Sequence, residues 1–257
     1  MRILLTNDDG IESIFIRELA LALVKQGHEL SVVAPRSEQS WVGASKSRNR
    51  GVHSDKADLG FGCPTWIVDG TPSDCVNIAI DHLLDTPPEG VVSGINIGLN
   101  TTLGFIIASG TVAGAFEGAI HGLPAIAFSQ EVTFETYELL KTPNGKPDAL
   151  LAEALKHSAS IGASISEELL RSIKPESFIV HNINFPLSCK PTTKIKRTVP
   201  AHMMVPGLFS PRGDDGKHNL KFKSGDDVSP GHIITDKAAI AEGYISHSLL
   251  DYTKLGA

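Results

Sequence analysis

Short apolar runs alternate with amphipathic stretches over the first three quarters of the chain. Residues 2–6, RILLT, form an apolar run that predicts a strand buried on both faces. Residues 13–27 then place apolar side chains at helical spacing and end at a glycine, and residues 29–35, ELSVVAP, predict a second buried strand. A strand, a helix and a strand within about 35 residues form the βαβ unit of a parallel sheet.

The same alternation continues to residue 186 and predicts a doubly wound α/β fold with a mostly parallel sheet. The apolar residues of segment 36–62 follow neither the helical nor the strand period, which predicts a long loop or a small excursion of the chain. The further predicted strands lie at residues 65–70, 89–96, 123–129 and 177–186, and the further predicted helices at residues 71–84, 109–122 and 149–173.

The pattern changes beyond Pro186, where prolines, glycines and charges crowd together and only residues 235–246 look ordered. We expect a boundary near residue 190, with a catalytic core over residues 1–190 and a C-terminal extension over residues 191–257. This extension is predicted to be an arm of hairpin and helix that packs on a neighbouring subunit, or a partly mobile segment.

Polar clusters follow three of the predicted strands. Asp8 and Asp9 follow the first strand, residues 35–40 follow the second, and Ser93 to Asn96 close the strand at residues 89–96. Because ligands gather at the carboxyl ends of the strands in a doubly wound sheet, we expect these clusters to meet at one edge.

Composition narrows the classes of partner. The formal net charge of the 257-residue chain is −6, which argues against a nucleic-acid polymer or an anionic membrane surface as the partner. The three cysteines are scattered and form neither a disulfide framework nor a zinc motif. No signal peptide and no apolar run of roughly 18 residues is visible, so we expect a cytoplasmic protein.

The neighbouring carboxylates of Asp8 and Asp9 have two interpretations. They hold a hard divalent cation through oxygen atoms, or they form a turn that caps the following helix. Asn96 and Asn100 either add neutral amide oxygens to a metal shell or belong to a polar turn. The hydroxyl of Ser40 is a candidate weak metal ligand or phosphate contact, although most loop serines are neither.

Ser109, Gly110 and Thr111 open a predicted helix of small residues. The free N–H groups and hydroxyls there suit a phosphate, and ordinary N-capping explains the same residues equally well. The chain lacks GxSxG, GxGxxG and P-loop motifs, which argues against a serine nucleophile, a dinucleotide cofactor and ATP hydrolysis.

Taken together, these stretches resemble the SurE family of nucleotidases. The matching segments occur in the family's order from the first residue to about residue 246, and the ordered set is more specific than any one of its members. They are MRILLTNDDGIES, VVAPRSEQS, DGTPSDCV, VVSGINIGLN, SGTVAGAFEG with GLPAIAFS, NINFP and TDKAAIAEGYIS.

The resemblance implies a Rossmann-like core and a metal-dependent phosphatase that hydrolyses nucleoside monophosphates at the 5′ or 3′ position, with short polyphosphate as a substrate of some members. It implies one divalent ion, Mg²⁺ or Mn²⁺, and a homodimer or homotetramer with an exchanged C-terminal arm. The implied metal ligands are Asp8, Asp9, Ser40 and Asn96. The implied phosphate-binding residues are Asn100, Ser109, Gly110 and Thr111.

We therefore hypothesise that a metal-activated water attacks phosphorus, with Asp8, Asp9 and Asn96 as the catalytic residues. The chain departs from the family pattern at Trp41 and Ala108, where the family usually has a small residue and an aromatic or polar residue. Two alternatives stay open: a nucleotide-binding protein with weakened catalysis, and a receiver-like module that binds Mg²⁺ at an acidic pair.

Overall fold

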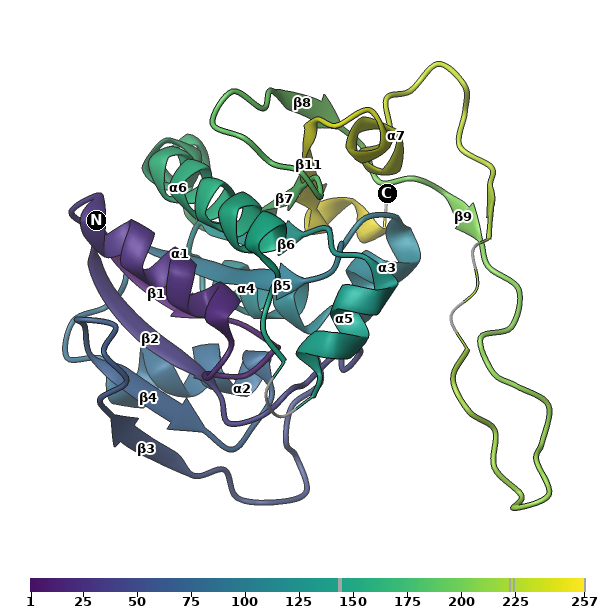
Figure 1. The fold of residues 1–257 in the computed structure, drawn as a ribbon. Helices are drawn as coiled ribbons and strands as arrows, with labels where there is room; N and C mark the ends of the chain where they lie inside the picture. The colour runs from purple at the N-terminus through teal and green to yellow at the C-terminus, as the bar shows by residue number, and fades with distance from the viewer. Residues whose placement is uncertain (143–144, 222, 224, 257) are drawn as a thin grey trace.

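A mostly parallel sheet forms the centre of the molecule in the computed structural model, which describes residues 1–142, 145–221, 223 and 225–256 (Figure 1). Within those residues the sheet has nine strands in the order β3-β4-β2-β1-β5-β6-β7-β11-β8. The strands are β1 (Arg2–Thr6), β2 (Glu29–Pro35), β3 (Ser54–Ala57), β4 (Thr65–Val68), β5 (Gly90–Ile97), β6 (Ala125–Gln130), β7 (Ile179–Phe185), β8 (Ile195–Thr198) and β11 (Ile245–Asp251).

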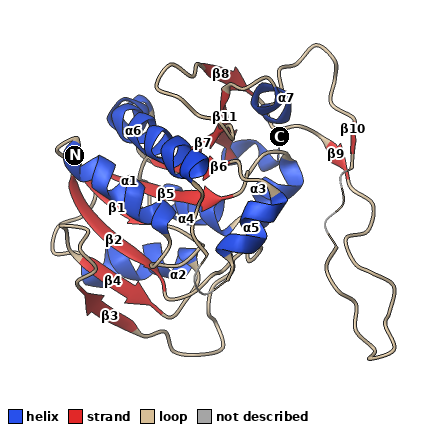
Figure 2. Cartoon of the chain, viewed as in Figure 1, coloured by secondary structure: helices blue, strands red, loops and turns tan. Residues whose placement is uncertain are grey.

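Helices cover both faces of this sheet (Figure 2). The helices are α1 (Ile14–Lys25), α2 (Pro72–Ile78), the π-helical turn η1 (Ala79–Leu83), α3 (Leu103–Ala108), α4 (Gly110–Ile120), α5 (Phe134–Leu140), α6 (Ala149–Ser172), α7 (Asp236–Ala241) and the 3₁₀ turn η2 (Tyr252–Gly256). The predicted doubly wound α/β fold is therefore confirmed.

Alternate residues of the strands point into two separate hydrophobic cores. Leu5 of β1 packs in the core that α1 and α6 cover, whereas Leu4 packs in the core beneath α2 and α4. The small residues of α4 allow it to lie close to β5, because a Cβ on Gly118 would lie 2.5 Å from Val91 Cγ2. This close packing brings the N-terminus of α4 near the end of β1.

The direction of the chain connections reverses beside β1. Strand β1 pairs in parallel with β2 on one side and with β5 on the other, and the chain reaches β5 only after completing β2, β3 and β4. Loops that leave β1 and β5 therefore diverge at this point and open a crevice at the carboxyl ends of the strands, where doubly wound folds bind ligands.

The segment beyond residue 190 has two parts. Strands β8 and β11 join the central sheet, with β11 antiparallel to β7 and parallel to β8. The short strands β9 (Met203–Met204) and β10 (Asp226–Asp227) pair with each other, and residues 205–221 extend away from the sheet (Figure 1). The expected boundary near residue 190 stays a prediction, and residues 222, 224 and 257 of the expected extension lie outside the described residues.

Several local features differ from the sequence expectations. The loop at residues 36–62 contains the edge strand β3, and the helix expected at residues 71–84 divides into α2 and η1. Helices α3 and α5 were not expected. Order beyond residue 190 is not confined to residues 235–246, because β8, β9, β10 and the end of β11 lie outside that range. Over the described part of the chain, no helix is both long enough and apolar enough to cross a membrane.

Candidate active site

The register of β1 against β5 places the first and third polar clusters, Asp8–Asp9 and Ser93–Asn96, side by side. Thr6 pairs with Ser93, so Asp9 and Asn96 each lie three residues beyond a paired position. The carboxylate of Asp9 accepts a hydrogen bond of 2.9 Å from the backbone N–H of Ile97. The two strand ends therefore meet, as the sequence predicts.

The loop after β2 brings Ser40 to the same place. The backbone N–H of Gln39 donates to the carbonyl oxygen of Asp8 at 2.7 Å, which fixes this loop against the end of β1. The Ser40 hydroxyl donates to Glu38 Oε1 at 2.7 Å, and Glu38 also pairs with Lys141 Nζ of the segment after α5 at 3.7 Å. Because the hydroxyl proton is directed to Glu38, the lone pairs of the Ser40 oxygen remain to ligate a cation.

Asn96 has its amide oxygen available in a similar way. Its Nδ2 donates to the carbonyl oxygen of Gly98 at 2.7 Å, which leaves the amide oxygen as the atom that would ligate a cation. Gly94, two residues earlier, has φ of 123°, and a Cβ there would clash with the carbonyl oxygen of Phe128. A glycine is thus required for β5 to curve toward Asp8 beside β6.

The N-terminus of α4 packs directly on Asp8. The Thr111 hydroxyl donates a short hydrogen bond to Asp8 Oδ1, and a Cβ on Gly110 would lie 2.8 Å from the Asp8 Cβ. The Ser109 hydroxyl accepts from the backbone N–H of Val112 at 3.1 Å, so this residue is an N-cap. The structure therefore contains the N-cap that the sequence offers as one interpretation of these residues. The hydrogen-bond partner of the Thr111 hydroxyl is the carboxylate of Asp8.

A network of asparagines holds the loop after β5. Asn100 Nδ2 donates to Ser129 Oγ at 2.9 Å, and its backbone N–H donates to Asn184 Oδ1 at 2.8 Å. Asn182 Nδ2 donates to the carbonyl oxygen of Asn100 at 2.8 Å. The NINFP stretch of β7 therefore positions Asn100, although the two segments lie more than eighty residues apart in the chain.

A cavity of about 430 Å³ lies where these elements meet. Five of the eight residues proposed from the sequence line it: Asp8, Ser40, Asn96, Asn100 and Ser109. Asp9, Gly110 and Thr111 lie outside this lining, but each contacts a residue that belongs to it. Asp9 contacts Ile97, and Gly110 and Thr111 both contact Asp8. The cavity continues past the polar residues into a region of aromatic side chains from α3, α5 and the loop after β2.

Burial makes both carboxylates costly to ionise. Burial raises the pKa of Asp8 to about 6, and burial together with the charge of Asp8 holds the pKa of Asp9 well above its usual value. Among the ion pairs of the described residues, none includes Asp8 or Asp9. Two carboxylates without a cationic partner, beside a serine and an asparagine oxygen, fit a divalent cation, which prefers oxygen ligands.

The donor set of this candidate site is unusual in having few charges. No group of three or more His, Cys, Asp or Glu side chains in the described ranges is arranged to hold a metal ion. The candidate site therefore depends on two carboxylates completed by the neutral oxygens of Ser40 and Asn96, and these four residues stay a prediction as ligands.

Comparison with known proteins identifies the family. The family model described as Survival protein SurE matches residues 3–205. The chain belongs to the SurE family.

Similar proteins cover nearly the whole chain. A protein of Trichormus variabilis named 5′-nucleotidase SurE is 31% identical over 98% of this chain and 93% of its own length. One of Thermus thermophilus named 5′-nucleotidase SurE 1 is 36% identical over 96% of this chain and 90% of its own length. A crystal structure of a SurE protein from Aquifex aeolicus superposes with a TM-score of 0.73 at 29% identity, covering 98% of this chain and 93% of that one.

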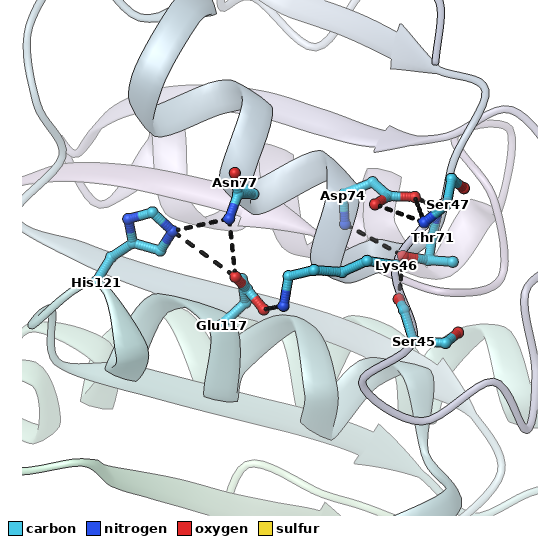
Figure 3. Close-up of polar contacts among 8 residues, drawn as sticks. All are labelled: Ser45, Lys46, Ser47, Thr71, Asp74, Asn77, Glu117 and His121. Atoms are coloured by element: carbon cyan, nitrogen blue, oxygen red, sulfur yellow. Dashed lines mark hydrogen bonds and ion pairs between the residues drawn. The ribbon is translucent and has the colours of Figure 1, made fainter. Parts of the chain in front are cut away.

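The loop that carries Ser40 in this SurE chain is held at its far end by a buried carboxylate. Glu117 of α4, only 1% exposed, accepts from Lys46 Nζ at 2.7 Å and from Asn77 Nδ2 at 3.0 Å (Figure 3). His121 Nε2 lies 3.7 Å from Glu117 Oε1, the oxygen that Asn77 also contacts. Lys46 thus ties the loop to α4, and Asn77 joins α2 to the same carboxylate.

Two further bonds fix the same loop to the N-terminus of α2. The carboxylate of Asp74 accepts from the backbone N–H of Ser47 at 3.1 Å, and the Thr71 hydroxyl donates to the carbonyl oxygen of Ser45 at 2.7 Å (Figure 3). Asp74 and Thr71 also form a reciprocal capping box. The DGTPSDC stretch therefore serves the site indirectly, by fixing the loop that bears Ser40.

The sequence reasoning missed three parts of this SurE site, the first of which is helix α3, which lines the cavity through Phe105. Glu38 was passed over within SEQS, although an acid two residues from a candidate ligand is a signal. Helix α5 was also missed, and its signal is Thr133 as an N-cap before Phe134, Tyr137 and Leu140 at helical spacing.

Proposed function

We propose that this SurE-family chain is a divalent-metal-dependent 5′-nucleotidase that hydrolyses nucleoside monophosphates to nucleoside and phosphate. The observation that supports it most is the pair of carboxylates without a cationic partner beside a cavity that Ser40 and Asn96 also line. The names of the relatives, which cover nearly the whole chain, support the same class of phosphatase.

Four residues would hold the cation: Asp8, Asp9, Ser40 and Asn96. A bound divalent ion would supply neutralisation of phosphate charge and a more acidic water for the attack. Thr111 keeps Asp8 in place through its hydroxyl, and the backbone N–H of Ile97 does the same for Asp9. The residues thus fix both carboxylates before substrate arrives, which lowers the reorganisation needed in the reaction.

The substrate phosphate would lie between Asn96 and the N-terminus of α4. Ser109 lines the cavity at this helix end, where backbone N–H groups and the helix dipole favour an anion. Asn100 lines it from the other side, held by Ser129 and β7. Gly110 leaves room for α4 to approach Asp8 closely.

Further properties belong to the same proposal. We include activity on 3′-nucleotides and short polyphosphate, Mg²⁺ or Mn²⁺ as the ion, a cytoplasmic location, and a homodimer or homotetramer that exchanges the extension beyond residue 190. The exposed apolar side chains of Met204 and Phe209 on the projecting segment support a packing role for it.

The direct test is release of inorganic phosphate from AMP and GMP by the full chain. Treatment with EDTA should abolish release, and added Mg²⁺ or Mn²⁺ should restore it. The Asp8→Asn variant should lose turnover, whereas Asp81→Asn, which removes an exposed carboxylate on η1, should keep it. Activity that survives chelation would refute the metal dependence, and tight AMP binding without turnover would favour a binding protein instead.

A further inference from the structure

The cavity has an aromatic end that the phosphate chemistry does not use. Trp41, Phe105, Phe134 and Tyr137 line it, and we call these four residues the aromatic wall. They come from three separate places: the loop after β2, helix α3 and helix α5. The same continuous cavity is lined by Asp8, Asn96 and Ser109 at its polar end.

Trp41 joins the aromatic wall to the polar residues of the lining through the chain itself. It directly follows Ser40, and its φ of 65° turns the chain sharply at this point. The indole is 43% exposed and meets the ring of Phe105 edge to face, with centroids 5.4 Å apart and planes at 79°. A single edge-to-face contact uses either the rim or one face of the indole, so at least one face of Trp41 is left by this contact for a base.

Helix α5 contributes two residues of the aromatic wall. Phe134 is 70% exposed on its first turn, and Tyr137 lies one turn further along. Lys141 Nζ lies 4.3 Å from the centroid of the Tyr137 ring and pairs with Glu38 at 3.7 Å. Glu38 in turn accepts from Ser40, so α5 and the Ser40–Trp41 turn are linked by one chain of contacts.

We propose that the aromatic wall binds the base of a nucleoside monophosphate by stacking, with Trp41 as the principal contact, so that purine substrates are preferred over pyrimidines and over base-free sugar phosphates. This inference rests on the proposed function, since it assigns the phosphate of the same molecule to the polar end. A cavity of about 430 Å³ is of the size that small-molecule ligands occupy.

The chemistry of the aromatic wall explains this order of preference. Aromatic faces attract any flat base, and the larger purine covers more of the ring than a pyrimidine does. Removal of one stacking side chain typically changes affinity for a base by roughly 5- to 150-fold. A sugar phosphate without a base has no atoms to place against the wall.

The first test compares AMP with ribose 5-phosphate, which shares the phosphate and sugar and lacks the base. In Trp41→Gly, which suits the positive φ, the ratio of kcat/KM for AMP to that for ribose 5-phosphate should fall about tenfold. Trp41→Phe should keep most of the ratio. Ile107→Ala, which shortens a 75% exposed side chain of α3 outside the cavity lining, should leave the ratio unchanged.

The second test measures binding without catalysis. Trp41 and Trp66 are the two tryptophans of the chain, so Trp66→Phe leaves Trp41 as the single indole reporter. Adenosine, which carries no phosphate to hydrolyse, should quench its emission, and ribose 5-phosphate should not. An emission that adenosine leaves unchanged would overturn the inference, as would equal losses of both substrates in Trp41→Gly.

These outcomes separate the two proposals. A wild-type protein that releases phosphate from neither compound would refute the proposed nucleotidase, and adenosine quenching would still support the base site. Phosphate release from AMP and ribose 5-phosphate with equal efficiency, without quenching by adenosine, would keep the phosphatase and reject the stacking site.

Discussion

Asp8→Asn should stabilise the metal-free protein while it removes activity. Burial raises the pKa of Asp8 to about 6 from a usual value of 3.8, so the folded state holds the proton more tightly than the unfolded state does. Between pH 3.8 and 6 the folded protein binds more protons, and its free energy of unfolding therefore falls as the pH rises. Above pH 6 the full cost of the buried charge is present.

The size of this cost follows from the gap between the two pKa values. About two pKa units correspond to roughly 3 kcal/mol at pH 7.5. An asparagine at position 8 keeps an oxygen that can accept from the Thr111 hydroxyl, so little of the gain is lost. We expect the variant to be more stable by about 2 kcal/mol in EDTA, a rise of several degrees in Tm for a chain of this length.

Divalent metal should reverse the order of stability. A cation that binds the folded wild type alone stabilises it by about 2.7 kcal/mol at a hundred times its Kd. The Asp8→Asn site has lost one carboxylate ligand, so it should gain much less. In EDTA the wild type should therefore unfold at a lower urea concentration than Asp8→Asn does. In saturating Mg²⁺ it should unfold at a higher urea concentration.

Urea unfolding at pH 7.5, with and without EDTA, measures both effects. Asp81→Asn removes one exposed negative charge and controls for the change in net charge. A loss of stability in metal-free Asp8→Asn would refute the electrostatic reasoning. Equal stabilisation of both proteins by Mg²⁺ would refute Asp8 as a ligand.

Three further predictions concern the supports of the site and of the sheet. Lys46→Met should lower the apparent metal affinity about fivefold, measured as activity against Mg²⁺ concentration. The reason is that the buried Glu117 loses its cationic partner, and the loop that carries Ser40 loses the contact that holds it to α4. Burial lowers the pKa of His247 to about 3, so the unfolded state takes up a proton before the folded state does as the pH falls. His247→Leu should therefore reduce the loss of unfolding free energy between pH 7 and 4.5, whereas the exposed control His82→Asn should not. Asp236→Asn should raise KM more than it lowers kcat, since Asp236 fixes the loop after Asn100.

The parallel core could be predicted because each strand there is a short buried run with its own boundaries. The predicted strand at residues 29–35 coincides with β2, where the apolar run ends at a proline. Strand β3, with three exposed residues among its four, carries no apolar signal, and its pairing with β4 alone defines it. Helix α5 has no fully buried residue, so its apolar pattern at Phe134, Tyr137 and Leu140 is weaker than the patterns of the core helices, and the sequence reasoning passed over it.

The prediction of the site was limited in the same way, because some of its residues are held by segments that lie far away in the sequence. The convergence of Asp8 and Asn96 follows from the rule for strand ends, and the sequence was sufficient for it. The hydrogen bond that the backbone N–H of Asn100 donates to Asn184 depends on the register of β6 and β7. The hydrogen bond that the backbone N–H of Thr102 donates to Asp236 joins residues 134 positions apart. Neither spacing is visible in a local pattern, so the supports of the loop after β5 could not be foreseen.

The two ends of the cavity differ in what holds them, and this difference has a consequence for specificity. The polar end is fixed by the register of β1 on β5 and by α4 packed on Asp8, where a shift of a few tenths of an ångström would disturb the proposed metal ligands. The aromatic wall comes from a loop, from α3 and from the exposed α5, where stacking tolerates small displacements. We therefore expect a substitution at Phe134 to change which base is preferred while the proposed ligands Asp8 and Asn96 keep their positions. A substitution at Trp41 also reaches the proposed ligand Ser40, because Trp41 directly follows it and the Ser40 hydroxyl is joined to α5 through Glu38 and Lys141.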